Sequence, residues 1–228
     1  MCGRIALFKS KEKIINELQI DKWDECDYLP NYNTVPSNNL YVLTSKKDLR
    51  VIKTMSWGIT SKWSKKKLIN ARVETLEQKP SFRDLINNNR CLIISDGYYE
   101  WKKERVDSQP YYIYRKSKKL ILMAGIWTTS NLNTGKDVNS CAIITKPTQH
   151  NISKIHHRMP LILHLSDVDK WLNSKDDSYC SISDLLYSNI ELEYHPISKA
   201  INNSFNNNNN NPELLNPIDL KKTINLFS

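Results

Sequence analysis

The chain has 228 residues, 39% hydrophobic and 25% charged, so it can bury a core as one globular domain without disulfides or structural metals. Lysine and arginine number 33 against 24 aspartates and glutamates, and this net charge of +9 favours a polyanionic partner. The five cysteines are odd in number and lack CxxC spacing, which argues against a disulfide framework and a cysteine-based zinc site. There is no apolar run of the ~20 residues that a membrane span needs, nor a signal-peptide pattern. We expect one domain over residues 1–228, monomeric, in a reducing intracellular compartment, the cytoplasm or the nucleus.

Many short strands and few helices are predicted by the apolar periodicity. We expect strands at residues 3–8, 39–43, 50–55, 90–95, 98–102, 111–115, 120–127, 141–145 and 191–195. We expect helices at residues 11–18, 81–88 (with Ser81 as N-cap), 167–172 and 183–187. Residues 68–73 are expected to be extended or a loop, and Asp96 and Gly97 to form a turn. Closely spaced strands with few helices between them favour an α+β fold with an antiparallel sheet over a parallel βαβ sheet.

Residues 206–211 are six consecutive asparagines, flanked by Asn202, Asn203 and Pro212. Such low-complexity sequence is typical of a loop, which we expect over residues 202–211 and before a short C-terminal tail.

Cys2 directly follows the initiator methionine, so removal of Met1 would leave a thiol and a free α-amine on one residue. The amine has an ordinary pKa of about 7.7–8.0 and can act as a base for its own thiol, as in N-terminal-nucleophile hydrolases. It can instead condense with an aldehyde, after which the thiol closes a five-membered thiazolidine ring. The alternative is that Cys2 is only part of a frayed terminus.

Two further positions have side chains suited to proton transfer. Glu100 lies in an aromatic strand segment, sharing a face with Tyr98 and opposing Trp101, where burial would raise the pKa of its carboxyl group. His156 precedes His157 and Arg158, which offers an imidazole beside a fixed cation. The alternatives are an exposed edge glutamate and a solvated basic loop.

Six motifs occur in order along the chain: MCGR at the start, NxxP within NYNTVP, WG, NARxET, DGYYEW and IHxRMP. Through these motifs the chain resembles the SOS-response-associated peptidase family, whose members are also described as abasic-site processing proteins. The resemblance extends from Met1 to about Ile218. The resemblance implies a compact α+β fold around a curved, barrel-like antiparallel sheet, with a positively charged groove for single-stranded DNA. The chain departs from the family pattern at His157, where the family usually has Asp, at Ser61, where it usually has Pro, and in the asparagine run.

The resemblance also implies roles for individual residues. Cys2 would be the nucleophile that bonds to an abasic site, Asn70 would hold the sugar or the Cys2 amine, Glu100 would be the acid/base group, and His156 would assist opening of the sugar ring. The DNA-binding residues that it implies are Arg4, Asn33, Trp63, Arg72 and Arg158.

From this resemblance we expect a covalent sensor of abasic sites in single-stranded DNA, which forms a thiazolidine crosslink through Cys2 with lyase-like imine chemistry and removes Met1 as an autopeptidase. It needs no metal or small-molecule cofactor, and no membrane. Two alternatives remain open: an N-terminal-nucleophile cysteine peptidase, and a non-covalent single-stranded DNA-binding module.

Overall fold

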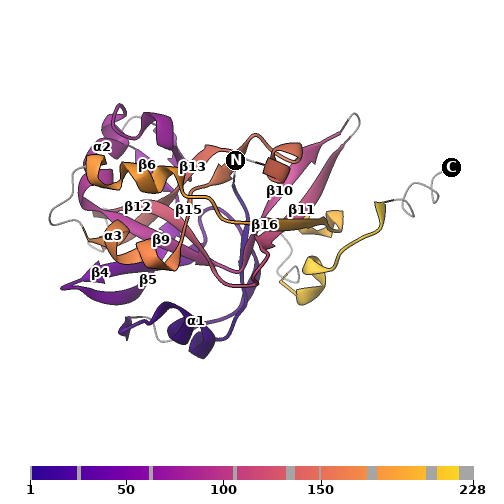
Figure 1. The fold of residues 1–228 in the computed structure, drawn as a ribbon, viewed down its shortest axis with the longest axis horizontal. Helices are drawn as coiled ribbons and strands as arrows, with labels where there is room; N and C mark the ends of the chain where they lie inside the picture. Colours follow the sequence, from indigo (N-terminus) through magenta and orange to yellow (C-terminus); the bar gives the residue numbers. More distant parts are fainter. Residues whose placement is uncertain are drawn as a thin grey trace.

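A computed structural model describes residues 2–24, 27–61, 64–104, 107–131, 137–148, 150–173, 179–203 and 210–220. Its centre is a closed barrel of five strands (Figure 1). The barrel strands are β4 (Asn39–Lys46), β5 (Leu49–Trp57), β9 (Arg90–Ser95), β12 (Ile121–Asn131) and β13 (Asp137–Pro147). The order β13-β12-β9-β4-β5 closes on itself because β5 also pairs with β13. The expected α+β fold with a barrel-like sheet is confirmed.

The sequence predicted an antiparallel sheet, but some strand pairs of the barrel are parallel. β13 runs parallel to β5 and to the short strand β8 (Asn70–Arg72), and β2 (Lys22–Trp23) runs parallel to β5. These pairings join strands far apart in the sequence, which local periodicity does not reveal. The other short strands are β6 (Ile59–Ser61), β7 (Ser64–Leu68), β14 (Arg158–Pro160) and β15 (Ile162–Leu163).

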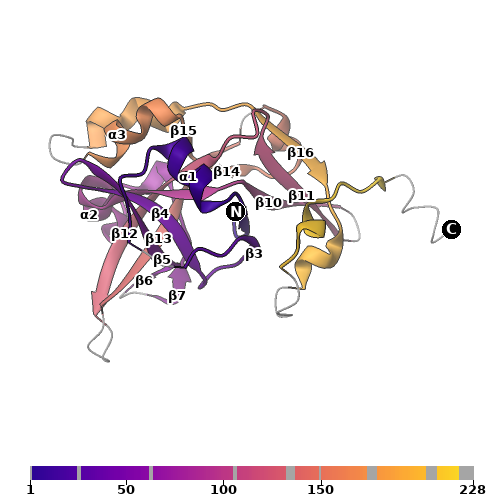
Figure 2. The same cartoon turned by 90° about the horizontal axis from the view of Figure 1, so that it is seen from below.

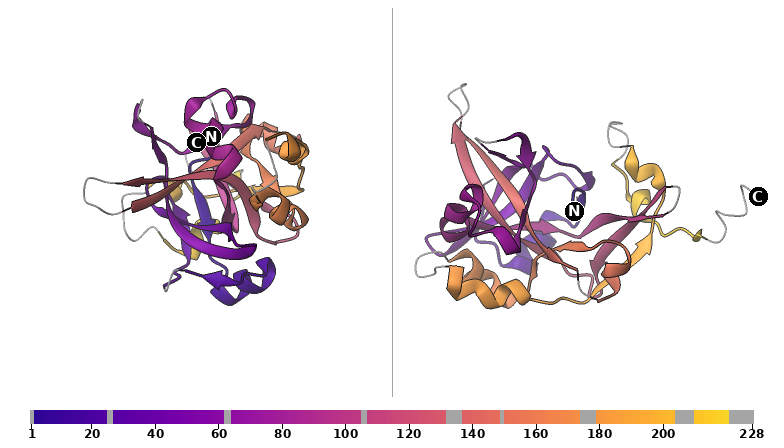
Figure 3. Two further views of the ribbon diagram at one scale, coloured as in Figure 1. Left: turned by 90° about the vertical axis from the view of Figure 1, so that its left-hand side faces the viewer. Right: turned by 90° about the horizontal axis from the view of Figure 1, so that it is seen from above.

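A second sheet of five strands leaves the barrel on one side (Figures 1 and 3). Its strands, in spatial order, are β16 (Leu192–Pro196), β11 (Ser108–Arg115), β10 (Gly97–Lys103), β1 (Ile5–Leu7) and β3 (Asn31–Thr34). Because β10 follows β9 after a single residue, Asp96, the chain passes directly from the barrel into this sheet. The start of the chain lies between the two parts (Figure 3).

Helices cover part of the outside of the barrel, and β9 is buried on both faces. The α-helices are α1 (Lys11–Leu18), α2 (Pro80–Asn88) and α3 (Val168–Leu172). Ile14, Phe82 and Trp171 from these helices pack in one apolar cluster with alternate barrel residues. The other barrel residues, such as Ile93 and Met123, form a second cluster that also contains Cys2. No helix among the described residues is long and apolar enough to span a membrane.

The described residues also form six 3₁₀ segments: η1 (Val73–Thr75), η2 (His150–Lys154), η3 (Leu165–Asp167), η4 (Tyr179–Tyr187), η5 (Lys199–Asn202) and η6 (Pro212–Leu215). η5 and η6 lie at the end of the molecule opposite α2 and α3 (Figure 2). Of the asparagine-rich loop, residues 204–209 lie outside the described residues, as do residues 221–228 of the tail. Asn210, the fifth of the six asparagines, is anchored: its side chain accepts a hydrogen bond from Tyr32 N and donates one to Pro30 O.

The helix predicted at residues 11–18 has these bounds, and Ser10 caps it by accepting a hydrogen bond from Lys13 N. The N-cap predicted at Ser81 is wrong, because α2 begins one residue earlier with Pro80 at its first position and Lys79 as an N-cap without a side-chain bond. The helix predicted at 183–187 is part of a longer 3₁₀ segment, η4. Residues 68–73 contain the strand β8.

Candidate active site at the start of the chain

Cys2 is fixed by contacts with both parts of the fold. Its side chain is fully buried in the second apolar cluster, which contains Ile93 and Met123. The strand β1, which begins three residues later, pairs with β10 of the second sheet through Ile5 and Tyr98. The Asn70 amide Nδ2 donates a hydrogen bond to the backbone carbonyl of Cys2 at 2.8 Å. The alternative of a frayed terminus is therefore not observed at Cys2.

Asn70 lies on β8, which is held against the barrel. β8 pairs in parallel with β13, so that Asn70 is opposite Ile143, and Ile143 N donates to Ile69 O at 3.0 Å. The other side-chain atom of Asn70, Oδ1, is buried and has no hydrogen-bond partner among the described residues. One half of the amide thus positions Cys2, while the other half remains able to accept a hydrogen bond from an amine or a sugar hydroxyl.

Glu100 is buried on β10, at 2% exposure, next to this terminus. Burial raises the pKa of its carboxyl group from 4.5 to about 7, the range in which a group can both accept and donate a proton near neutral pH. Burial first, and the Glu100 carboxylate second, raise the pKa of the Cys2 thiol well above its ordinary value. Glu100 shares its strand face with Tyr98, which packs in the cluster of Cys2, and the raised pKa keeps the thiol protonated near neutral pH.

The raised pKa makes a prediction for stability. Because the folded-state pKa of about 7 lies above the ordinary 4.5, the folded protein holds a proton that the unfolded chain releases, so stability falls as pH rises between these values. Glu100→Gln does not titrate, so its stability relative to the parent should rise across this window by on the order of 1–3 kcal/mol. Thermal melting at both ends of the window measures this. The exposed Glu104→Gln is the control, and an equal pH trend in Glu100→Gln and the parent would contradict it.

His156 is half-buried, and its ring stacks on the exposed His157 with centroids 4.4 Å apart. Its Nδ1 lies 3.0 Å from Arg158 N and 3.1 Å from Arg158 O. A neutral ring can accept from the amide and a protonated ring can donate to the carbonyl, so both protonation states have a partner. Burial, the largest cause, lowers the pKa of His156 below 6.5, which favours the neutral ring.

Arg4 and Asn33 are brought together at one edge of the second sheet. Arg4 Nη1 donates to Asn33 Oδ1 at 2.6 Å and to Ile201 O at 2.7 Å, and the guanidinium lies 5.6 Å from the centroid of the Trp101 ring. Asn33 therefore helps to fix the orientation of the Arg4 guanidinium.

The other arginines differ in their exposure. Arg72 is exposed on β8, two residues after Asn70, and so shares its strand face. Arg158 is only 6% exposed and is ion-paired with Glu74, and it donates to Thr145 O at 2.6 Å. A phosphate could reach the Arg158 guanidinium only in competition with these partners. Trp63 lies outside the described residues.

Two residues at the site were not found from the sequence. Glu74 pairs with Arg158, 84 residues away in the chain. Tyr98 is fully buried in the cluster of Cys2, and its hydroxyl has no hydrogen-bond partner among the described residues. The two-residue spacing in the strand had already placed Tyr98 on the face of Glu100, but Tyr98 was not assigned to the site.

Relatives of this chain are found by sequence and by structure. Curated proteins named abasic site processing protein include YoqW of Bacillus subtilis (35% identical, covering 94% of this chain and 99% of the relative) and YedK of Escherichia coli (30%, covering 96% and 100%). The rat protein HMCES, named likewise, is 30% identical over 96% of this chain and 77% of its own. A crystal structure of a Bacteroides thetaiotaomicron protein superposes with a TM-score of 0.81 at 26% identity, covering 96% of this chain and all of that one.

A family model described as SOS response associated peptidase matches residues 1–204, which include the start of the chain and all six motifs. The match, together with relatives at 30–35% identity over nearly the whole chain, shows that this protein belongs to the SOS response associated peptidase (SRAP) family.

Proposed function

We propose that this protein processes abasic sites in single-stranded DNA by forming a thiazolidine crosslink through Cys2 after removal of Met1. The observation that carries the proposal is the arrangement at Cys2: Asn70 holds its backbone at 2.8 Å, and the buried Glu100 carboxyl lies close enough to shift the pKa of its thiol. The names of the relatives support DNA at abasic sites as the substrate.

The chemistry needs one amine, one thiol and a means of proton transfer. An abasic deoxyribose exists mainly as a closed hemiacetal, and opening its ring exposes an aldehyde at C1′. The Cys2 amine adds to this carbon and water is lost, which gives an imine. The Cys2 sulfur then adds to the imine carbon while its proton passes to the nitrogen, which closes the thiazolidine ring. No oxidant or metal takes part in these steps.

Proton transfer to and from the sugar is the role we assign to Glu100 and His156. A carboxyl group with a pKa of about 7 can take the hydroxyl proton of the hemiacetal and return a proton later. With Nδ1 accepting from Arg158 N, the neutral His156 ring carries its proton on Nε2 and can donate a hydrogen bond that stabilises the ring oxygen, to which the Glu100 carboxyl group returns the proton. The unpartnered Asn70 Oδ1 would accept a hydrogen bond from the amine or from a sugar hydroxyl.

Backbone contacts suffice for DNA binding, because an abasic site has no base to read. We assign phosphate contacts to Arg4, oriented by Asn33, and to Arg72, which is exposed next to Asn70. We assign Arg158 instead to positioning, because its guanidinium is held by Glu74 while its backbone contacts His156.

Mixing the protein with abasic single-stranded DNA and separating the products under denaturing conditions tests the proposal. A protein–DNA band that survives denaturation is the expected result. Peptide cleavage without that band would support the cysteine peptidase, and binding without either product would support the non-covalent module.

Arg72→Ala should weaken binding to single-stranded DNA and reduce the slope of log affinity against log salt by about one. The physical reason is that one phosphate contact, and the counterion release that accompanies it, is lost. Fluorescence anisotropy over a salt series measures the slope. Arg83→Ala, which removes an exposed arginine from α2, is the matched control and should leave the slope unchanged. An unchanged slope in Arg72→Ala would assign that residue a structural role.

His156→Ala should slow crosslinking more than His157→Ala, because His157 is exposed while the His156 ring is held by the Arg158 backbone. Single-turnover crosslinking at saturating DNA compares the two variants, with thermal melting as the check on folding. A folded His157→Ala that reacts more slowly than His156→Ala would show that the wrong histidine was assigned.

A further inference from the structure

A pocket on the second sheet, here called the aromatic pocket, lies on the face opposite Glu100. In β10 the residues Tyr98 and Glu100 share one face, and Tyr98 packs in the cluster of Cys2. Tyr99 and Tyr112 pack in a separate cluster on the other face. The pocket opens on that second face and so is separate from the site at Cys2.

The aromatic pocket has a volume of about 430 Å³, within the range of about 300–1,000 Å³ that is typical of small-molecule sites. Ring side chains form much of its lining: Phe8, Tyr112, Tyr114 and His195. Tyr112 and Tyr114 are stacked with centroids 5.5 Å apart, and the His195 ring is within 5.8 Å of both. The pocket therefore offers flat apolar surfaces for a planar ligand.

These rings are held in place by the surrounding backbone. His195 Nε2 donates to Leu215 O at 2.8 Å, which joins β16 to the C-terminal segment. Gly97 lies under Tyr112, where a Cβ atom would come within 2.4 Å of that ring. The Asp96–Gly97 sequence thus serves to admit the Tyr112 ring, and the pocket wall is preformed.

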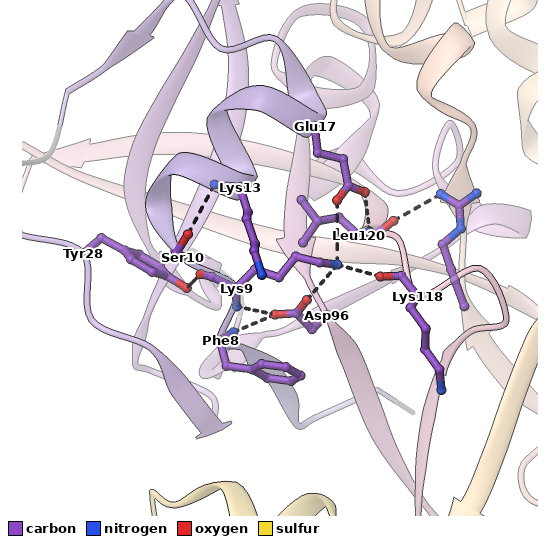
Figure 4. A network of polar contacts seen from close by, with 10 residues as sticks. Phe8, Lys9, Ser10, Lys13, Glu17, Tyr28, Asp96, Lys118 and Leu120 are labelled. Carbon is purple, nitrogen blue, oxygen red and sulfur yellow. Dashed lines mark hydrogen bonds and ion pairs between the residues drawn. The ribbon is translucent and has the colours of Figure 1, made fainter.

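The charges at the pocket fall into two groups. In the first group, the positive charge of Lys9 is neutralised by carboxylates: Lys9 Nζ lies 3.1 Å from the carboxylate of Asp96 and 3.7 Å from that of Glu17 (Figure 4). Asp96 also accepts hydrogen bonds from the backbone amides of Phe8 and Lys9. Lys9 therefore brings little free charge to a ligand.

The second group is the pair of exposed lysines Lys13, on α1, and Lys118, before β12. Neither forms an ion pair with an acidic residue among the described residues. The Lys118 ammonium lies 3.5 Å from the centroid of the Tyr114 ring, so it is held at the pocket instead of extending into solvent. Two lysines without an acidic partner in the described part of the chain, beside an aromatic wall, favour a ligand that is both planar and anionic.

We propose that the aromatic pocket binds a nucleotide, its base against the aromatic wall and its phosphate between Lys13 and Lys118. Base–aromatic stacking and lysine–phosphate contact both hold nucleotides without depending on which base is present. An acidic peptide would use the lysines but not the rings, and an apolar ligand would use the rings but not the lysines.

Deoxyadenosine monophosphate is the probe, and calorimetric titration of the full chain measures its binding. The parent should bind it saturably, and more tightly than deoxyadenosine, which lacks the phosphate. The double variant Lys13→Glu/Lys118→Glu should bind it at least tenfold more weakly, because two attractive charge contacts become repulsive. Lys119→Glu, at an exposed lysine next in the chain that does not line the pocket, is the matched control and should bind as the parent does.

A second arm shows whether the nucleotide is free or part of a DNA strand. If undamaged single-stranded DNA of about 12 nucleotides also binds the double variant more weakly than Lys119→Glu, the pocket holds part of the strand. If only the mononucleotide is affected, it holds a free nucleotide. Absence of saturable binding by the parent, or equal binding by the parent and the double variant, would overturn the proposal. Crosslinking to abasic DNA at saturating concentration, assayed in parallel, reports separately on Cys2.

Discussion

Cys2→Ala is expected to abolish the denaturation-resistant DNA adduct and to leave much of the non-covalent binding to single-stranded DNA. The thiol that closes the thiazolidine ring is lost, whereas the side chains of Arg4 and Arg72, which we assign to the phosphates, are unchanged. Denaturing electrophoresis measures the adduct and fluorescence anisotropy measures binding.

Cys2→Ser is the matched control for this variant. It keeps the α-amine and a hydroxyl group, so it can still form an imine, but a hydroxyl closes a less stable ring and its adduct should be lost on prolonged incubation. An adduct from Cys2→Ala that equals that of the parent in yield and stability would remove the Cys2 thiol from the mechanism.

Glu100→Gln should slow adduct formation by about 10²–10⁴-fold while it changes DNA binding little, because an amide keeps the size of the side chain but cannot exchange a proton. The parent rate should also change its pH dependence near pH 7, where the buried carboxyl group titrates, and this inflection should be missing from the variant. Single-turnover crosslinking over a pH series measures both effects.

Glu104→Gln is the control, since it makes the same chemical change just beyond the same strand at an exposed position. It should react at the parent rate with the parent pH profile. If Glu100→Gln also reacts at the parent rate, the buried carboxyl group is structural and proton transfer must be assigned to another residue.

Local patterns in the sequence predicted the elements that depend on local interactions. The helix at residues 11–18 follows from its apolar spacing, and the strand at residues 90–95 follows from its apolar stretch at residues 91–94. The predicted N-cap at Ser81 was wrong because Pro80, which precedes it, occupies the first position of the helix. Proline is tolerated there because an amide hydrogen at that position would have no partner within the helix.

Contacts between distant segments could not be predicted in the same way. Closure of the barrel depends on pairing of β5 with β13, whose paired residues are 84 positions apart. The pairing of Arg158 with Glu74 depends on a third element, β13, whose Thr145 also accepts from Arg158. The motif IHxRMP made Arg158 look available to DNA, but only the fold shows that its guanidinium is buried.

The candidate site was predicted through motif resemblance more than through spacing. Cys2, Asn70 and Glu100 come from three segments of the chain, and no local pattern indicates that Asn70 contacts the Cys2 carbonyl. Burial of Glu100 was one of two readings of its aromatic surroundings, and the structure supports that one.

The mass of the crosslinked product, with the site of attachment mapped by peptide sequencing, tests the central claim most directly. The account predicts the mass of the chain without Met1 plus that of the abasic oligonucleotide less one water, with the DNA attached at Cys2. A fully active protein that retains Met1, or an adduct mapped to a lysine side chain, would contradict it.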